Sequence, residues 1–441
     1  MSHPADREQQ RRWLSELAEQ GALATHLLRW IVLGSLSGVL AGASSFIFLE
    51  GLDRVTEVRE DNDWLLWLLP AAGLVVGLAY HLLAGRAGKG NELLLDQIHE
   101  PTEWVPRRMA PMVLLGTWVT HLFGGSAGRE GTALQMSGSL TDAVSRVLRL
   151  RAEDRRLMLI AALGGAFGAV FGVPLAGAVF ALEVQAIGRV RYDALVPALT
   201  ASIVGDLVVL GLGYEHEARP QFGLDLTIGL VGKVALAGLA FGLAGAAFVE
   251  LTHAIRAVMR RVRWAPLRPV IGGAAIVGLA VLFGRDYLGL SLPLVERALD
   301  GDQLSFAVFA LKILFTAVTL GCAFPGGEVT PLFVIGASLG AALAAPLGLP
   351  AAALASVGFV AVFAGAANTP LACTIMGVEL FGSAATVPMA VGCVVAYVFS
   401  NHRGIYSTQR IHTAKGPGPI AGAPTLGSWS SRRPGSPPPA H

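Results

Sequence analysis

Two stretches of this chain carry glutamate and threonine at the same spacing within glycine-rich sequence. Residues 128–134 read Gly-Arg-Glu-Gly-Thr-Ala-Leu and residues 326–332 read Gly-Gly-Glu-Val-Thr-Pro-Leu, so both fit G-x-E-x-T-x-L. A second matched pair follows, because residues 173–183 and 369–379 share Pro-Leu-Ala and a closing glutamate. The two pairs occur in the same order and are separated by nearly the same length of chain. This arrangement predicts two homologous halves.

A carboxylate inside such a stretch points to anion chemistry. A helix that begins there leaves its first backbone N–H groups unpaired and directs the positive end of its dipole at a bound anion. Gly128 and Gly131 keep side chains away from that backbone, and Thr132 and Thr330 add hydroxyl donors. Glu130 stands where the anion would bind. Its carboxylate can occupy the site when ionised and leave it when protonated, which would make it both a gate and a proton carrier.

A simpler interpretation of Glu130 is an ordinary glutamate in the first turn of a helix, or a partner of Arg129 in a loop. The recurrence of the pattern in both halves favours a site instead. Ionisable groups inside membrane segments are also costly and are usually functional, which points in the same direction.

The composition indicates a multi-pass membrane protein. Of the 441 residues, 53% are hydrophobic and only 15% are charged, whereas soluble proteins carry about 25% charged residues. The 54 glycines suit close helix packing in lipid. A net charge of +2 gives no indication of nucleic acid. The three cysteines lie in apolar segments without metal-ligand spacing and are expected to be small buried hydrophobes, so we expect no metal site and no cofactor.

The sequence is interpreted as one membrane domain with two flanking segments. Residues 1–26 hold many charges and predict an amphipathic helix on the cytoplasmic membrane surface. Residues 27–412 form the membrane domain, with repeat halves of about 27–213 and 225–412. Residues 413–441 are rich in Pro, Gly and Ser and predict a disordered tail. Short helices interrupted by Gly or Pro at matching places in two halves are typical of a transporter's binding site.

Other ionisable residues in apolar segments have simpler explanations. Glu183 and Glu379 end the matched Pro-Leu-Ala helices and are expected to be water-exposed or capping carboxylates. Lys233 and Lys312 are expected to snorkel to the surface or to pair with a carboxylate. Histidines without metal spacing are expected to lie at interfaces or to pack in the interior: His81, His121 and His253.

Four motifs together resemble the CLC family of chloride channels and anion/proton antiporters, over roughly residues 30–412. The family's G-[KR]-E-G-P motif matches residues 128–132, and its G-x-F-x-P motif matches residues 327–331. Its Pro-Leu-Ala-Gly helix matches residues 174–177, and its C-terminal tyrosine matches Tyr406. The resemblance implies an all-α polytopic fold of two inverted-topology repeats with many short, tilted or broken helices.

The departures from that pattern are similar to the fluoride-specific CLC-F branch. Gly-Lys-Gly-Asn-Glu at 88–92 replaces the stretch whose serine contacts chloride, and Thr132 replaces the motif proline. Glu328 replaces a non-polar filter residue, and Val184 stands where chloride antiporters carry an internal proton-transfer glutamate. The branch implies fluoride export driven by proton entry, and a homodimer with one pathway per subunit in the bacterial inner (plasma) membrane. Lys89 could attract anions at the inner mouth or be a solvated loop charge.

The leading hypothesis is therefore a fluoride/proton antiporter rather than an enzyme, with ions and the lipid bilayer as its partners. Glu130 and Glu328 are expected to serve proton transfer and gating. The expected anion-binding residues are Gly128, Arg129, Gly131, Thr132, Val329, Thr330, Tyr406 and Asn91. A chloride/proton antiporter or passive chloride channel of the same fold is the first rival. An intramembrane enzyme lacks a supporting motif, and a scaffold would not need buried glutamates.

Overall fold

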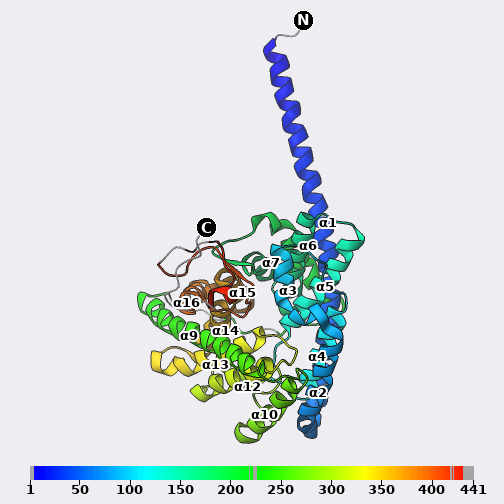
Figure 1. The fold of residues 1–441 in the computed structure, drawn as a ribbon. Coiled ribbons are helices and arrows are strands. Elements are labelled where there is room, and N and C mark those ends of the chain that lie inside the picture. The colour runs from blue at the N-terminus through cyan, green and yellow to red at the C-terminus, as the bar shows by residue number, and fades with distance from the viewer. Residues whose placement is uncertain (1–3, 218, 222–225, 418–419, 421, 431–441) are drawn as a thin grey trace.

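The structure is a computed structural model that describes residues 4–217, 219–221, 226–417, 420 and 422–430 (Figure 1). This part of the chain is built almost entirely from helices. The α-helices of the first half are α1 (Pro4–Asp61), α2 (Leu69–Ala79), α3 (Asn91–His99), α4 (Met109–Leu122), α5 (Glu130–Val147), α6 (Ala152–Phe171), α7 (Pro174–Glu183) and α8 (Leu195–Gly211). Those of the second half are α9 (Ile228–Met259), α10 (Leu267–Phe283), α11 (Leu292–Leu299), α12 (Phe306–Gly321), α13 (Val329–Leu347), α14 (Ala351–Ala367), α15 (Pro370–Phe381) and α16 (Thr386–Phe399).

Shorter elements join these helices. Single turns of 3₁₀ or π-helix lie at η1 (Asp63–Leu68), η2 (Tyr80–Ala84), η3 (Gly85–Lys89), η4 (Tyr192–Ala194) and η5 (Ser383–Ala385). Two-residue strands β1 (Ala186–Ile187) and β2 (Arg410–Ile411) pair in parallel, and α17 (Leu426–Ser430) follows them. The expected all-α fold is confirmed apart from this small strand pair.

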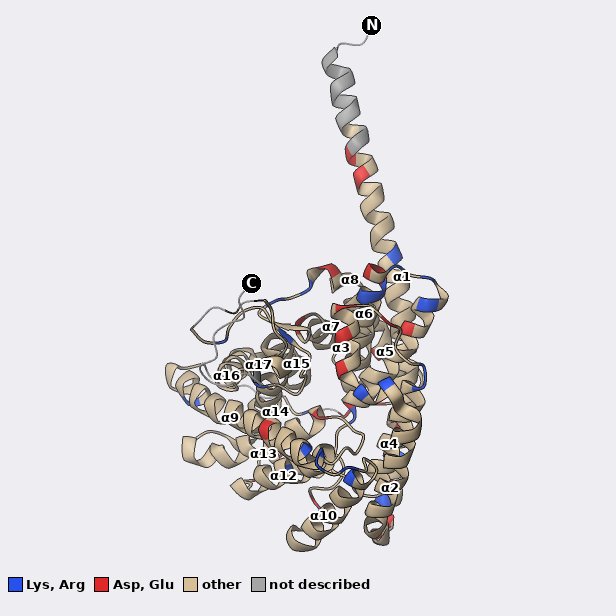
Figure 2. Ribbon diagram, viewed as in Figure 1, with Lys and Arg blue, Asp and Glu red and all other residues tan. Residues whose placement is uncertain are grey.

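Within the described residues, five helical segments are long and apolar enough to cross a membrane, and several apolar helices are shorter. Figure 2 shows charged residues mainly on loops and helix ends, with the helices tan over most of their length. Small residues allow the helices to pack closely: a Cβ on Gly336 of α13 would lie 2.0 Å from the carbonyl oxygen of Gly358 in α14. All three cysteines are buried and unbonded, as expected.

The two halves lie side by side (Figure 1). Helices α7 and α15, which carry the matched Pro-Leu-Ala segments, pack against each other. Glu183, the last residue of α7, accepts hydrogen bonds of 3.1 and 2.9 Å from first-turn amides of α15. Glu379, near the end of α15, accepts bonds of 2.9 and 2.7 Å from first-turn amides of α7. Because each helix end meets the other's start, the two helices are antiparallel, as inverted repeats require.

The structure differs from the expected N-terminal segment. Residues 1–26 were expected to form a separate surface helix, but α1 runs without a break from Pro4 to Asp61. No proline follows Pro4 within this stretch, so nothing in the sequence interrupts the helical hydrogen bonding. The first part of α1 projects beyond the remaining helices in Figure 1, and residues 16–29 are exposed.

The C-terminal segment also differs from its prediction. The disordered tail expected over 413–441 is wrong for the part that the structure describes up to residue 430, and residues 431–441 lie outside the described chain. Leu426 is only 4% exposed and packs with Ile187 and Ile411, and Trp429 lies against this cluster. The prediction of disorder from composition was wrong here because these few apolar side chains pack against the strand pair. Helix α11 was likewise not expected.

Candidate functional site

The two G-x-E-x-T-x-L stretches meet at the centre of the molecule. The amide of Gly128 donates to the carbonyl of Gly327, and the amide of Gly327 donates to the carbonyl of Gly128, both at 2.7 Å. Helix α5 begins at Glu130 and α13 begins at Val329, so two helix N-termini converge at this pairing. Glycine is required here, because a Cβ on Gly128 would lie 2.8 Å from the ring of Pro331.

The side chain of Glu130 lies at the N-terminus of α13, the equivalent helix of the other repeat. It is 1% exposed, and its Oε2 accepts a 3.1 Å hydrogen bond from the amide of Thr330. Its Oε1 accepts a second bond from the Thr330 hydroxyl. A carboxylate held by a first-turn amide and hydroxyl has the contacts that a bound anion would use. The described side chains of Arg129 and Glu130 form no ion pair, which disfavours the simpler interpretation of a loop pair.

The first repeat's threonine behaves differently. Thr132 is buried and shares a 2.7 Å hydrogen bond with Thr117 of α4, so its hydroxyl does not reach Glu130. Asn91 begins α3 beside this point: a Cβ on Gly131 would lie 3.1 Å from its Nδ2. The buried Oδ1 of Asn91 has no hydrogen-bond partner among the described residues. Its side chain therefore lies beside the start of α5, where its Oδ1 can still accept a hydrogen bond.

Glu328 lies at the start of α13 and faces a different set of groups. Its Oε1 is 3.9 Å from Nη2 of Arg256 in α9, and its side chain is one-fifth exposed. Tyr406 is 4% exposed, and the charges of Glu328 and Glu130 both act on its hydroxyl group. The loop that carries Tyr406 is fastened to α3, because the Ser407 hydroxyl donates to Glu92 at 2.7 Å. The structure thus gathers Glu130, Glu328, Thr330, Tyr406 and Asn91 around one region.

Sequence reasoning missed Arg256 and Glu92 in this region. Arg256 lies in the long apolar helix α9, and Glu92 ends the stretch 88–92 that stands in place of the family's chloride-contacting segment. No local pattern reveals either residue, because Arg256 meets Glu328 and Glu92 meets Ser407 only through tertiary packing. Val329 is buried just inside α13, and Lys89 is exposed in the turn before α3.

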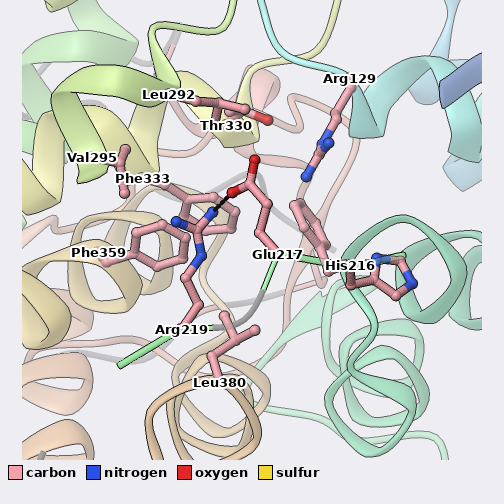
Figure 3. Close-up of a pocket in the computed structure, with 11 residues that line it drawn as sticks. Arg129, His216, Glu217, Arg219, Leu292, Val295, Thr330, Phe333, Phe359 and Leu380 are labelled. Atoms are coloured by element: carbon pink, nitrogen blue, oxygen red, sulfur yellow. Dashed lines mark hydrogen bonds and ion pairs between the residues drawn. The ribbon is translucent and has the colours of Figure 1, made fainter. Parts of the chain in front are cut away.

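A small cavity lies next to Thr330 (Figure 3). Its volume of about 30 Å³ has room for a water molecule or a small ion. Arg129 and Glu217 point toward each other in Figure 3, and Arg219 donates to Glu217 at 2.5 Å. Burial lowers the pKa of Arg219 and raises that of Tyr214 in the same loop. The remaining lining residues are Phe171, His216, Leu292, Val295, Phe333, Phe359 and Leu380.

The other ionisable residues fall into three groups. Glu183 and Glu379 are capping carboxylates, one of the two expected outcomes, but each caps the other repeat's helix. Lys233 is exposed and its Nζ lies 3.4 Å from the carbonyl of Gly348, whereas Lys312 is completely buried and does not snorkel. His121 is also completely buried, and neither of its ring nitrogens has a hydrogen-bond partner in the described chain.

Comparison with known proteins places this geometry in a family. The profile described as "Voltage gated chloride channel" matches residues 72–401. The chain belongs to the CLC family. This membership confirms the resemblance carried by the four sequence motifs. It also agrees with the inverted repeats and with the pairing of the two glutamate stretches at the centre of the fold.

Two curated CLC relatives match over most of their length. The chain is 47% identical over 407 residues to a "Chloride/fluoride channel protein" of Pseudomonas syringae pv. tomato (strain ATCC BAA-871 / DC3000), covering 90% of each chain. It is 26% identical over 418 residues to the "H(+)/Cl(-) exchange transporter ClcA" of Cronobacter sakazakii (strain ATCC BAA-894), covering 86% of this chain and 88% of the relative.

Solved CLC structures also superpose well. A CLC-type fluoride/proton antiporter matches with a TM-score of 0.84 and 34% identity, over 87% of this chain and 98% of that one. A slow cyanobacterial Cl⁻/H⁺ antiporter matches with a TM-score of 0.73 and 19% identity, over 85% and 93% of the two chains. At that identity the second match shows only the shared fold.

Proposed function

We propose that this protein is a secondary active antiporter that exports fluoride in exchange for protons. The observation that carries the proposal is the seat of Glu130 on the amide and hydroxyl of Thr330, at the N-terminus of α13. The 47% identity to a chloride/fluoride channel protein and the likeness to a fluoride/proton antiporter support fluoride as the anion. The departures from the chloride pattern at Asn91, Thr132 and Glu328 support the same choice.

Glu130 is the proposed gate and proton carrier. When ionised, its carboxylate takes the two donors of Thr330 and keeps an anion from them. When protonated, it no longer competes for these donors, and its O–H can donate to fluoride, which is a strong acceptor. Its burial supports this role, because an ionised carboxylate held away from water carries a desolvation cost. Gain or loss of a proton therefore changes the energy of the site substantially.

Glu328, Tyr406 and Asn91 are the proposed groups around the ion path. Glu328 is the second proton-transfer carboxylate, and its partial exposure and neighbour Arg256 support exchange with water on that side. Tyr406 is buried, feels the charge of both carboxylates and offers a hydroxyl donor. The amides of Gly128, Arg129, Gly131 and Val329, with the hydroxyl of Thr132, complete the proposed donor set. These roles require no cofactor and no enzymatic step.

The proposed assembly is a homodimer in the bacterial inner (plasma) membrane, with one pathway per subunit. Its support is the set of exposed apolar side chains on α7 and α15 and on the helices that pack against them, α8 and α16. Leu175 and Leu371, at equivalent positions of α7 and α15, are 52% and 53% exposed. Other exposed leucines and valines lie on α8 and α16: Leu207, Leu210, Val387, Val394 and Val398.

The direct test is transport by purified protein in liposomes. Vesicles are loaded with fluoride or chloride, an outward anion gradient is imposed, and anion release and external pH are recorded together. Fluoride release with proton uptake and little chloride release is the expected result. Comparable chloride flux would replace this proposal by the chloride antiporter, and fluoride flux without proton uptake would indicate a passive channel.

A further inference from the structure

Lys312 lies in α12 with no exposed surface and with an ammonium group surrounded by oxygen atoms. Four oxygens lie within hydrogen-bond distance of its Nζ: Ser291 Oγ at 2.8 Å, the Gly289 carbonyl at 2.9 Å, Ser126 Oγ at 3.0 Å and the Tyr287 carbonyl at 3.3 Å. We call these four oxygens the Lys312 cage. All four are neutral groups. No carboxylate among the described residues lies within 4.0 Å of the ammonium.

A buried cation without a counter-ion normally costs a great deal of free energy. Its neighbour Arg59 is also positive, which adds to that cost. The cage offsets it by replacing the water shell of the ammonium with two carbonyls and two hydroxyls. Rings of carbonyl oxygens replace the hydration shell of K⁺ in channels in the same manner. The Lys312 cage therefore has the chemistry of a site for a monovalent cation that is already filled by a side chain.

The cage is joined directly to the first glutamate stretch. Its Ser126 also shares a 2.9 Å hydrogen bond with the hydroxyl of Thr316, and its amide donates to the hydroxyl of Thr319 at 3.1 Å. Three side chains of α12 therefore hold Ser126, which lies four residues before Glu130 in the chain. Helix α12 also ends shortly before the second G-x-E-x-T-x-L stretch. This one helix therefore positions the residues that precede both stretches.

The repeat does not itself demand a lysine at this position. The offset that aligns Glu130 with Glu328 makes Leu114 of α4 the equivalent of Lys312. Helix α4 packs against α5 in the first half as α12 packs against α13 in the second. An apolar side chain is thus sufficient to build the equivalent helix. The lysine and its cage are a feature added to one repeat only.

We propose that Lys312 is a tethered cation that positions Ser126, and through it the Gly128–Glu130 segment, and that the cage binds a free monovalent cation once the ammonium is removed. K⁺ is the probe, because it resembles an ammonium group in size and charge. Lys312→Ala empties the cage. Lys312→Met fills the same space with a neutral chain, which cannot satisfy the four oxygens. Leu114→Ala is the matched control in the other repeat.

The first readout is thermal unfolding in detergent, which does not depend on the proposed transport function. Each variant is compared in KCl and in N-methylglucamine chloride at equal ionic strength. K⁺ is expected to raise the melting temperature of Lys312→Ala and to leave the wild type, Lys312→Met and Leu114→Ala unchanged. Lys312→Ala that melts at the same temperature in both salts overturns the proposal.

The second readout is fluoride release from liposomes and rests on the proposed function. Lys312→Ala is expected to release fluoride about tenfold more slowly in N-methylglucamine, as loss of a charged hydrogen-bond network implies, and to recover in K⁺. Lys312→Met is expected to be slow in both salts. Wild-type flux in Lys312→Met overturns the positioning role. If the wild type itself releases no fluoride, the proposed function fails while the melting result still decides the cage.

Discussion

Thr330 gives both its backbone amide and its hydroxyl to the carboxylate of Glu130, although 200 residues of chain separate them. The contact joins the start of α5 in one repeat to the start of α13 in the other. It is possible because Gly128 and Gly327 pair through their backbones immediately beside it. The acidic group of the first half is therefore bound by the helix start of the second.

Glu130→Gln is expected to abolish proton coupling. The amide keeps the shape of the side chain but can neither carry the charge that occupies the Thr330 donors nor release a proton. Fluoride release and proton uptake are measured together in liposomes. Glu57→Gln, at an exposed glutamate of α1, is the control and is expected to behave as the wild type. Proton-driven fluoride transport at the wild-type rate in Glu130→Gln would remove the proposed role.

Thr330→Val and Thr132→Val are expected to differ although they are equivalent in the two repeats. Thr330→Val removes a hydroxyl that donates to a buried carboxylate, a contact that contributes about 1.5–3 kcal/mol. We expect weaker proton coupling and slower fluoride release. Thr132→Val removes the bond to Thr117 and one proposed fluoride donor, so it should lower stability and slow fluoride release. Proton coupling should stay intact, because Thr132 does not contact Glu130. Equal coupling in the two variants would contradict the asymmetry of the site.

Gly131→Ala is expected to reduce transport strongly. Its Cβ would lie 3.1 Å from Nδ2 of Asn91 and 3.2 Å from the Cα of Gly327, so it presses on both halves of the site. Gly232→Ala, on an open face of α9 where a Cβ meets nothing within 4 Å, is the matched control. Helix propensity predicts a gain of roughly 0.5–1 kcal/mol there. Initial fluoride release from liposomes compares the two, and unchanged release by Gly131→Ala would argue against close packing.

Glu183→Ala is expected to destabilise the fold more than Glu379→Ala. Each change leaves two first-turn amides of the opposite repeat without an acceptor, at a cost of about 1–3 kcal/mol. Glu183 is only 7% exposed, so water cannot replace it as readily as it replaces Glu379. Thermal unfolding in detergent measures both. Glu250→Ala removes a surface ion pair with Arg403 and should change little. The reverse order of the two caps would be inconsistent with the observed burial.

Lys415 is expected to make stability depend on pH. Burial lowers its pKa to about 7, and its Nζ donates to the Tyr397 carbonyl at 2.8 Å and to Ser400 Oγ at 2.9 Å. In the unfolded chain its pKa returns to about 10.4. Between these values the unfolded state binds more protons, so the free energy of unfolding rises with pH.

Melting temperatures of the wild type and Lys415→Met, measured from about pH 7 to about pH 10, test this prediction over the window set by the two pKa values. The wild type should gain stability relative to the variant as the pH rises. Lys233→Met replaces an exposed lysine and should show a constant difference from the wild type. A constant difference for Lys415→Met as well would show that its amine does not change its proton occupancy on unfolding.

Local sequence was sufficient for most of the helices and for the principal candidate residues. The two G-x-E-x-T-x-L stretches mark the starts of α5 and α13, and the two Pro-Leu-Ala segments mark α7 and α15. It was insufficient where a few side chains met distant partners. The tail around Leu426 and the continuous α1 were both predicted incorrectly, because composition does not report which apolar side chains find a packing surface.

The sequence by itself determined the membrane class, the two repeated halves and the candidate carboxylates, since these depend on composition and on the order of residue types. Only the tertiary structure decided which partners those carboxylates have. Glu130 binds Thr330 of the other repeat, Glu183 caps a helix of the other repeat, and Lys312 is enclosed by oxygens from other segments. Antiparallel packing of the two halves creates these contacts, and no local pattern encodes distances between residues so far apart in the chain.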